Sequence, residues 1–216
     1  MNNQRNLTVY RLYAPVYDAL FRPVFQTARK RAIDQLRLQS GERLLLSGAG
    51  TGLDLPLIPP DVRVTAVDLS HPMLQKAREK GNGRAAFALM DAQRLGLADA
   101  SFDAVALNLI LSVVPDGATA FSEAWRALSP GGRAVIFDKF LPENGRLSPL
   151  RRAVGRVIAG LGTDPNRRLS DVLQATEPIC IEQNEASILR GQYRIILLRK
   201  PEDTTKNEDY RDENRT

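Results

Sequence analysis

Residues 43–55 read Arg-Leu-Leu-Leu-Ser-Gly-Ala-Gly-Thr-Gly-Leu-Asp-Leu, and a second apolar run follows them and ends at Asp68. The three leucines are typical of a buried parallel strand, and the three glycines are typical of a tight turn that a ligand can approach closely. A strand, a glycine turn, a second strand and a terminal acid predict a nucleotide-binding half-fold. Asp68 follows the first glycine, Gly48, at the spacing where a carboxylate binds the hydroxyl groups of a ribose.

The glycine spacing differs from two widespread nucleotide-binding turns. A dinucleotide-binding turn reads Gly-x-Gly-x-x-Gly, whereas Leu53 occupies the third position here and the glycine comes one residue early, at Gly52. A phosphate-binding loop would need Gly-Lys-Ser/Thr after four spacer residues, and the sequence has no such run. The glycines alone are also compatible with a plain strand-to-helix turn, so other features must decide between these readings.

Length and composition are those of one α/β domain with a full core. We expect that domain to span residues 1–200. No apolar run is long enough to cross a bilayer, and the N-terminus lacks the apolar segment of a signal peptide, so a cytoplasmic protein is expected. The single cysteine, Cys180, excludes an internal disulfide and is expected to be buried. No Cys/His cluster is visible, so no metal is expected.

The net charge of +5 is unevenly distributed along the chain. Residues 1–40 carry seven basic and two acidic side chains, and residues 141–170 carry six and two. Two basic segments beside one site would suit peripheral contact with an anionic membrane, whereas the alternative is ordinary solvated helix faces. Residues 201–216 carry six acids and three bases without an apolar run, which predicts a disordered tail.

Periodicity and turn residues predict the remaining elements. Apolar residues at helical spacing predict an amphipathic helix over 20–36, and the short spacing between 178–181 and 193–199 predicts a hairpin. Residues 141–165 are expected to form a helical insertion over the carboxyl ends of the strands. The other predicted elements are strands over 62–67, 86–90, 102–110 and 133–140, helices over 54–57, 71–81, 116–128 and 168–175, and a tight turn over 129–132.

Five features occur in one order: Gly48-x-Gly50-x-Gly52, Asp68, Met90-Asp91-Ala92, Phe102-Asp103-Ala104-Val105 and Leu128-Ser129-Pro130-Gly131-Gly132. Together they resemble the class I S-adenosylmethionine-dependent methyltransferases over roughly residues 10–200. Within that class, residues 13–18 and 112–116 resemble the ubiquinone-biosynthesis and bacterial phospholipid N-methyltransferase groups. The resemblance implies a Rossmann-like α/β fold with a seven-stranded, mostly parallel sheet and an antiparallel C-terminal hairpin. It also implies an N-terminal helical lid within residues 1–40 and a substrate-side insertion over 141–170.

The resemblance implies roles in binding S-adenosyl-L-methionine. The glycine turn would pass close to the methionine part of the cofactor, and Asp68 would bind the ribose hydroxyls. Asp91 would accept a hydrogen bond from the adenine amino group, and Asn108, through its carbonyl, would hold the methionyl ammonium. The complete set implied for the cofactor is Tyr17, Gly48, Ala49, Gly50, Gly52, Asp68, Leu69, Met73, Asp91, Ala92 and Asn108.

One position departs from the family pattern. The family usually has an acid two residues before the first glycine, where it helps to hold the methionyl end, and this chain has Leu46 there. An apolar side chain cannot make that contact. Either water and Ser47 replace the acid, or cofactor affinity is lower than usual, or the chain binds the cofactor without turnover.

Three residues are candidates for chemistry. Tyr17 lies on the expected lid. His71, the only histidine, has a reference pKa near neutrality and is expected at a helix N-terminus beside adenine. Asp138, with Lys139, is expected at the carboxyl end of a strand, where open α/β sheets bind substrates, although a surface ion pair is the alternative. A phenol or carbon acid would need a general base, whereas an amine can lose its proton after transfer.

The sequence therefore favours a methyltransferase that acts on a small-molecule or lipid-like acceptor, for example a phosphatidylethanolamine-type head group. Methylation of a quinone or another small molecule at carbon, oxygen or sulfur is one alternative, and a non-catalytic S-adenosylmethionine-binding protein is another. A nucleic-acid partner is disfavoured, because no Asn-Pro-Pro-Tyr-like run follows Asn108 and the basic segments lack interleaved aromatic residues.

Overall fold

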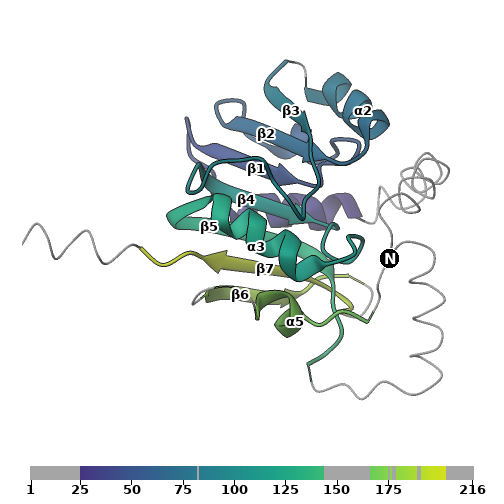
Figure 1. Cartoon of the computed structure of the whole chain (residues 1–216), viewed down its shortest axis with the longest axis vertical. Coiled ribbons are helices and arrows are strands. Elements are labelled where there is room, and N and C mark those ends of the chain that lie inside the picture. The colour runs from purple at the N-terminus through teal and green to yellow at the C-terminus, as the bar shows by residue number, and fades with distance from the viewer. Residues whose placement is uncertain are drawn as a thin grey trace, which may run out of the picture.

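The computed structural model describes residues 25–81, 83–143, 166–174, 176, 179–188 and 191–202. Their central layer is a seven-stranded sheet of order β3-β2-β1-β4-β5-β7-β6 (Figure 1). Strands β1 to β5 are mutually parallel, β7 runs antiparallel to β5, and β6 runs antiparallel to β7. The strands are β1 Arg43–Ser47, β2 Arg63–Asp68, β3 Ala85–Leu89, β4 Phe102–Asn108, β5 Leu128–Lys139, β6 Cys180–Ala186 and β7 Tyr193–Arg199.

This architecture confirms the predicted α/β class, the mostly parallel sheet and the C-terminal hairpin. The expected lid residues before 25, including Tyr17, lie outside the described residues. The same is true of 144–165 in the expected insertion and of 203–216 in the expected tail.

The central strands are apolar on both faces because helices cover both sides of the sheet. Alternate residues of a strand point to opposite faces. In β1, Leu45 belongs to one core with Phe121 and Trp125. Leu44 and Leu46 belong to the other core, with residues of the helix over 25–35. The continuous apolar run is therefore divided between two cores, as a doubly wound sheet requires.

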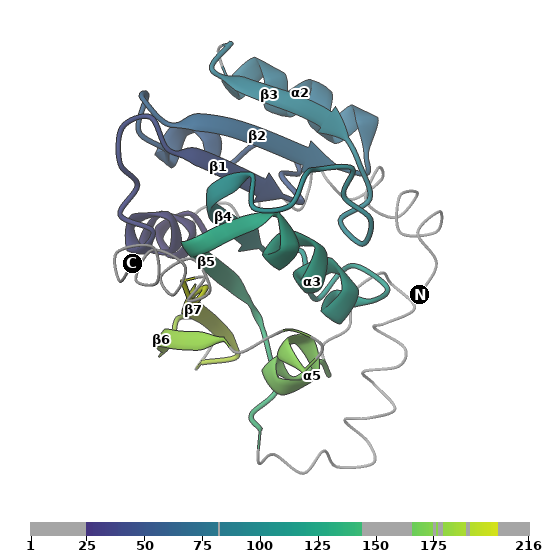
Figure 2. The same cartoon turned by 60° about the vertical axis from the view of Figure 1, so that its left-hand side comes forward.

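Helices form a layer on each side of the sheet. Helix α3, Gly117–Ala127, covers one face, and the helix over residues 25–35 lies on the opposite face (Figures 1 and 2). The short helix α5, Leu169–Leu173, joins the α3 side. On the other side, the 3-10 turn η1, Leu55–Leu57, and helix α2, His71–Gly81, contact each other.

Two local expectations are wrong. Residues 129–132 do not form a separate tight turn but belong to β5. The pairing passes from Phe102 with Leu128 to Ala104 with Arg133, so four residues of β5 stand opposite one residue of β4. Cys180 is exposed rather than buried, because β6 is an edge strand whose residues are almost all exposed. The apolar residues next to Cys180 in the sequence do not indicate that its strand lies at the edge of the sheet.

The packing of α3 predicts a large effect of truncating its central aromatic residue. Phe121 is fully buried, and its ring lies 5.4 Å from that of Trp125. Phe121→Ala should lower the free energy of unfolding by about 3–5 kcal/mol, because the substitution removes buried apolar surface and leaves a cavity. Phe121→Leu, which keeps most of the volume, should cost clearly less. Chemical denaturation followed by circular dichroism measures both, and equal losses would contradict the packing argument.

Candidate functional site

The predicted site residues collect at one edge of the sheet. Strand β1 pairs with β2 on one side and with β4 on the other. The chain therefore fills the sheet outward from β1 in one direction through β2 and β3, and in the other direction through β4 and β5. Such a switch point opens a crevice at the carboxyl ends of the strands, where open α/β sheets bind ligands. Residues at or just past these ends are the glycine turn after β1, Asp68 after β2, Asp91 after β3, Asn108 after β4 and Asp138 in β5.

The three glycines of the turn are needed for two different reasons. All three have positive φ, between +56° and +75°, which side chains rarely adopt. A Cβ on Gly48 would lie 2.5 Å from the side chain of Ile110, and one on Gly52 would lie 2.8 Å from Cα of Ala77. A Cβ on Gly50 would meet no atom within 4 Å. Gly48 and Gly52 therefore permit close packing, whereas Gly50 leaves open space beside the turn.

Asp68 holds this turn against the end of β2. Its Oδ2 accepts a hydrogen bond of 2.8 Å from Gly50 N–H, and its Oδ1 accepts one of 2.8 Å from Ser70 N–H. Burial raises the pKa of the Asp68 carboxyl, although these backbone donors act in the opposite direction. Asp68 therefore places an anionic acceptor inside the crevice and fixes the path of the turn around it.

Polar atoms without partners line the switch point. The side chains of Ser47 and Asn108 are 1% and 4% exposed, yet the Ser47 hydroxyl and both amide atoms of Asn108 have no hydrogen-bond partner. Leu46 is buried in the core and belongs to the cluster that packs the helix over residues 25–35. Buried polar atoms are normally paired, so these three atoms mark a place where a polar ligand would bind.

Asp91 is held by a glutamine that the sequence analysis did not single out. The Gln93 backbone N–H and its side-chain amide donate to Asp91 Oδ1 at 3.0 and 3.1 Å, and the amide also reaches Oδ2 at 3.3 Å. The amide oxygen of Gln93 accepts from the backbone N–H of Asp116 at 2.9 Å. One side chain therefore links the end of β3 to the start of α3.

The loop that follows β4 is held from two sides. Asp138 is fully buried and accepts from the backbone N–H groups of Ser112, at 3.0 Å, and Lys139, at 2.8 Å, so the alternative of a surface ion pair is wrong. Burial raises the pKa of the Asp138 carboxyl. The Arg167 guanidinium donates to the carbonyl groups of Leu111, Val114 and Pro115. Nothing in the sequence near Arg167 signals this contact, which joins residues far apart in the chain.

A second unforeseen contact ties a helix to the glycine turn. Arg29, from the helix over 25–35, donates from Nη1 to both carboxylate oxygens of Asp54, at 2.9 and 2.8 Å. Both side chains are largely buried. Asp54 comes directly before η1, so this pair fixes the segment that leaves the turn.

The remaining predicted residues have different environments. Ala49 and Ala92 are buried, Leu69 and Met73 are half-buried, and His71 is exposed as the first residue of α2. Tyr17 lies outside the described residues. Among the described residues no group of three or more His, Cys, Asp or Glu side chains is placed to hold a metal, and no helix there is long and apolar enough to cross a membrane.

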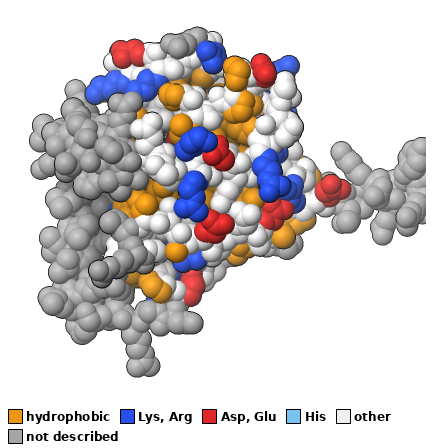
Figure 3. All heavy atoms as spheres, turned by 180° about the vertical axis from the view of Figure 1, so that it is seen from behind, with side chains coloured by type: hydrophobic (Ala, Val, Ile, Leu, Met, Phe, Trp, Pro, Cys, Tyr) orange, Lys and Arg blue, Asp and Glu red, His pale blue; other side chains and the backbone are white. Residues whose placement is uncertain are grey.

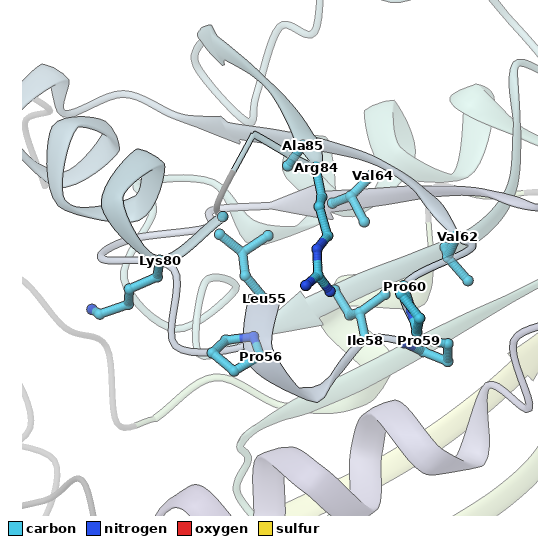
Figure 4. Close-up of a pocket in the computed structure, with 11 residues that line it drawn as sticks. Leu55, Pro56, Ile58, Pro59, Pro60, Val62, Val64, Lys80, Arg84 and Ala85 are labelled. Carbon is cyan, nitrogen blue, oxygen red and sulfur yellow. The ribbon is translucent and has the colours of Figure 1, made fainter.

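One pocket lies away from these residues. It has a volume of about 310 Å³ and opens near the amino ends of β2 and β3, where Pro56, Pro59 and Pro60 face Arg84 (Figure 4). The predicted cofactor residues do not line it. The crevice at the carboxyl edge and this pocket are therefore separate features.

Comparison with known proteins agrees with the fold. Residues 45–136 match the family model described as a methyltransferase domain. The chain is 36% identical over 152 residues to a phosphatidylethanolamine N-methyltransferase of Cereibacter sphaeroides, covering 68% of this chain and 74% of that protein. It is 30% identical over 202 residues to a demethylmenaquinone methyltransferase of Deinococcus radiodurans, covering 85% and 84% of the two chains.

Solved structures share the fold at low identity. The structure of geranyl diphosphate C-methyltransferase from Streptomyces coelicolor, determined with S-adenosyl-L-homocysteine, matches with a TM-score of 0.68 at 16% identity, covering 81% of this chain and 76% of that one. The [4+2]-cyclase SpnF matches with a TM-score of 0.68 at 20% identity, covering 82% of each chain.

The sheet order and the site at its carboxyl edge define a Rossmann-like enzyme of the methyltransferase class. The chain belongs to the class I S-adenosylmethionine-dependent methyltransferases, and S-adenosyl-L-methionine is its cofactor. The acceptor class is a small molecule or a lipid.

The raised pKa of Asp138 predicts a pH-dependent stability. A carboxyl whose folded pKa exceeds its unfolded value binds its proton more tightly in the folded state, so its contribution to stability falls as pH rises above the ordinary value of about 3.9. Asp138→Asn cannot ionise. Relative to Asp138→Asn, the wild-type protein should therefore be less stable at about pH 7 than at about pH 3, which lies below the ordinary pKa of the carboxyl. Urea unfolding at both pH values measures the difference, and a pH-independent difference would refute the burial argument.

Proposed function

We propose that the crevice at the carboxyl edge binds S-adenosyl-L-methionine through Asn108, Ser47, the glycine turn, Asp68 and Asp91. The observation that carries this proposal is the set of unpaired buried polar atoms on Ser47 and Asn108. A methionyl group offers an ammonium donor and a carboxylate acceptor. The Asn108 amide has both an acceptor and a donor, so it can pair with either group.

Asn108 also accounts for the departure at position 46. Strands β1 and β4 are adjacent, with Leu46 opposite Ala106, so Asn108 lies two residues further along β4 on the same face of the sheet as Leu46. Leu46 belongs to the core and leaves the methionyl end without a carboxylate from β1. We propose that the neutral amide of Asn108 replaces that carboxylate, and that a neutral partner binds the ammonium less strongly than an ionised one.

Asp68 and Gly50 fit the adenosine part of the cofactor. A carboxylate has about four lone-pair sites, so Asp68 can accept from ribose hydroxyls in addition to its two backbone donors. The open space beside Gly50 lets a ligand approach the backbone. Leu69 and Met73 are proposed to lie against adenine, and Asp91 to accept from its amino group with Ala92 alongside.

The chemistry needs little from the protein beyond placement. When bound, the cofactor would supply a methyl group whose carbon a nucleophile can attack, while the positively charged sulfur leaves as the neutral thioether of S-adenosyl-L-homocysteine. The chain then has to hold the acceptor in line and exclude water, and correct placement alone supplies about 7–11 kcal/mol of the barrier reduction. We propose that Asp138 acts by holding Ser112 in the loop after β4, because its carboxylate is fully buried and already bonded to that loop.

We propose that the acceptor is the amine of a phosphatidylethanolamine-type head group. The relative from Cereibacter sphaeroides supports this choice. A neutral amine attacks through its nitrogen lone pair and releases its proton after transfer, so no general base is required. Tyr17 is proposed to close over the site from the N-terminal segment.

Contact with an anionic membrane is part of this proposal, and it depends on segments that are basic in sequence. On the face seen in Figure 3, Lys and Arg side chains are interspersed with Asp and Glu. Ion pairs such as Arg31–Glu185 and Arg43–Asp103 join the two signs. The proposal therefore assigns membrane contact to the basic residues of 1–24 and 144–165.

The second candidate acceptor is a reduced quinone of the menaquinone type. The demethylmenaquinone methyltransferase of Deinococcus radiodurans is similar over 85% of the chain. A phenol or its ring carbon must lose a proton to react, which requires a general base. For this acceptor, His71 is the candidate base, because a neutral imidazole can accept a proton.

Replacing Asn108 by leucine separates a binding role from a structural one. The substitution removes unsatisfied buried polar atoms, so Asn108→Leu should leave the free protein as stable as the wild type or more stable. It should nevertheless weaken binding of S-adenosyl-L-homocysteine by about 10- to 100-fold, the value of hydrogen bonds to charged groups. Calorimetric titration and thermal melting give the two quantities. Asp61→Ala, at an exposed acid far from the site, is the control. Unchanged affinity in Asn108→Leu would refute its proposed role.

The acceptor is tested with cofactor labelled in its methyl group. Vesicles that contain phosphatidylethanolamine and an anionic lipid should give label in the lipid extract, whereas vesicles of phosphatidylcholine and the same anionic lipid should not. Asp68→Ala should abolish the label, since it removes the proposed ribose contact. Label transferred to a demethylmenaquinol but not to the lipid amine would reject the first acceptor in favour of the second.

A further inference from the structure

We propose that Gln93 is a positioning residue that makes the enzyme selective for an adenine base over a deaminated base. The inference rests on the proposed function, in which Asp91 accepts from the adenine amino group. It adds a residue that does not touch the ligand but sets the direction of the carboxylate that does.

The orientation of the Gln93 amide follows from its two partners. The backbone N–H of Asp116 can only donate, and it lies 2.9 Å from the amide oxygen. The amide nitrogen therefore faces Asp91, where it lies 3.1 Å from Oδ1 and 3.3 Å from Oδ2. With the backbone N–H of Gln93 at 3.0 Å from Oδ1, three donor contacts from one residue hold the carboxylate.

The far side of this link is rigid. The Asp116 side chain caps α3, accepting from the Thr119 backbone N–H at 3.0 Å and from its hydroxyl at 2.7 Å. Helix α3 is fixed in turn by the burial of Phe121 and Trp125. Gln93 therefore ties Asp91, which follows the edge strand β3, to the packed helix α3.

Selectivity follows from the acceptor character of Asp91. The amino group of adenine is a donor, whereas the corresponding oxygen of hypoxanthine is an acceptor and would face the carboxylate oxygens. A site built to bond one such group rejects the analogue that cannot complete the bond. The rejection requires a carboxylate that cannot turn away, and the hydrogen bonds from Gln93 supply that restraint.

Two variants test the contacts that the Gln93 side chain makes with Asp91 and with Asp116 separately. Gln93→Met keeps the length of the side chain but removes both side-chain contacts. Gln93→Glu keeps an acceptor for Asp116 N–H and places a carboxylate, rather than a donor, beside Asp91. Gln75→Met is the matched control, because Gln75 is exposed on α2 and is absent from the proposed site.

The experiment measures the affinities of the full chain for S-adenosyl-L-homocysteine and S-inosyl-L-homocysteine by calorimetric titration. The wild type and Gln75→Met should prefer the adenosyl compound. Gln93→Met should reduce that preference by about fivefold, within the usual coupling between contacting residues, with the loss confined to the adenosyl compound. Gln93→Glu should reduce it further, because a second carboxylate repels that of Asp91 instead of donating a hydrogen bond to it.

Four results would overturn the inference. An unchanged preference in Gln93→Met means that Asp91 needs no support. An equal loss for both ligands means that Gln93 only maintains the loop. Failure of the wild type to bind S-adenosyl-L-homocysteine removes the proposed function itself, and the Gln93 role falls with it. A double variant, Asp91→Ala with Gln93→Met, should have the same preference as Asp91→Ala alone, and an additional loss would show that Gln93 acts independently of Asp91.

Discussion

The site depends on one buried carboxylate that accepts hydrogen bonds from two loops. Asp68 ends β2 and accepts from Gly50 in the turn after β1 and from Ser70 before α2. Taking a carboxylate out of water is costly, and the raised pKa of Asp68 records that cost. The backbone donors offset part of it, so the turn is held in the shape that brings N–H groups to the acid. The same shape requires positive φ at Gly48, Gly50 and Gly52. The glycines and the acid therefore act as one unit.

Much of the fold could be predicted from the sequence because its signals are local. The apolar runs of β1 and β2, the turn glycines and the terminal acid lie within 26 consecutive residues, 43–68. Strand β7 was predicted with the bounds that it has, Tyr193–Arg199. The errors occur where neighbours in space decide. Residues 129–132 have the composition of a turn but belong to β5, because β4 pairs with Leu128 before them and with Arg133 after them. The burial predicted for Cys180 is wrong because the apolar residues around it do not indicate whether their strand lies inside the sheet or at its edge.

The candidate site also combines features that are local in the sequence with contacts that only the fold brings together. The residues proposed for the cofactor follow strand ends, and strand ends can be read from the sequence. The contacts that orient them come from a distance: Arg29 reaches Asp54, Gln93 reaches Asp116, and Arg167 reaches the loop after β4. A glutamine or an arginine in a polar stretch carries no signal of a partner more than 20 residues away. Only the fold reveals that these side chains have structural partners.

This division explains why the cofactor is easier to infer than the acceptor. The residues proposed to bind S-adenosyl-L-methionine are turn backbone and acids at strand ends, whose positions the parallel sheet fixes. The acceptor must reach the same carboxyl edge beside the loop after β4, whose position is set by Asp138 and Arg167. Arg167 binds backbone carbonyl groups of the loop, and Asp138 binds both the backbone N–H and the side chain of Ser112, so the path of the loop depends little on its other side chains. The side chains of that loop can then change to suit another acceptor without disturbing the cofactor. Relatives that act on a lipid amine and on a quinone, both similar to this one chain, are consistent with such an arrangement.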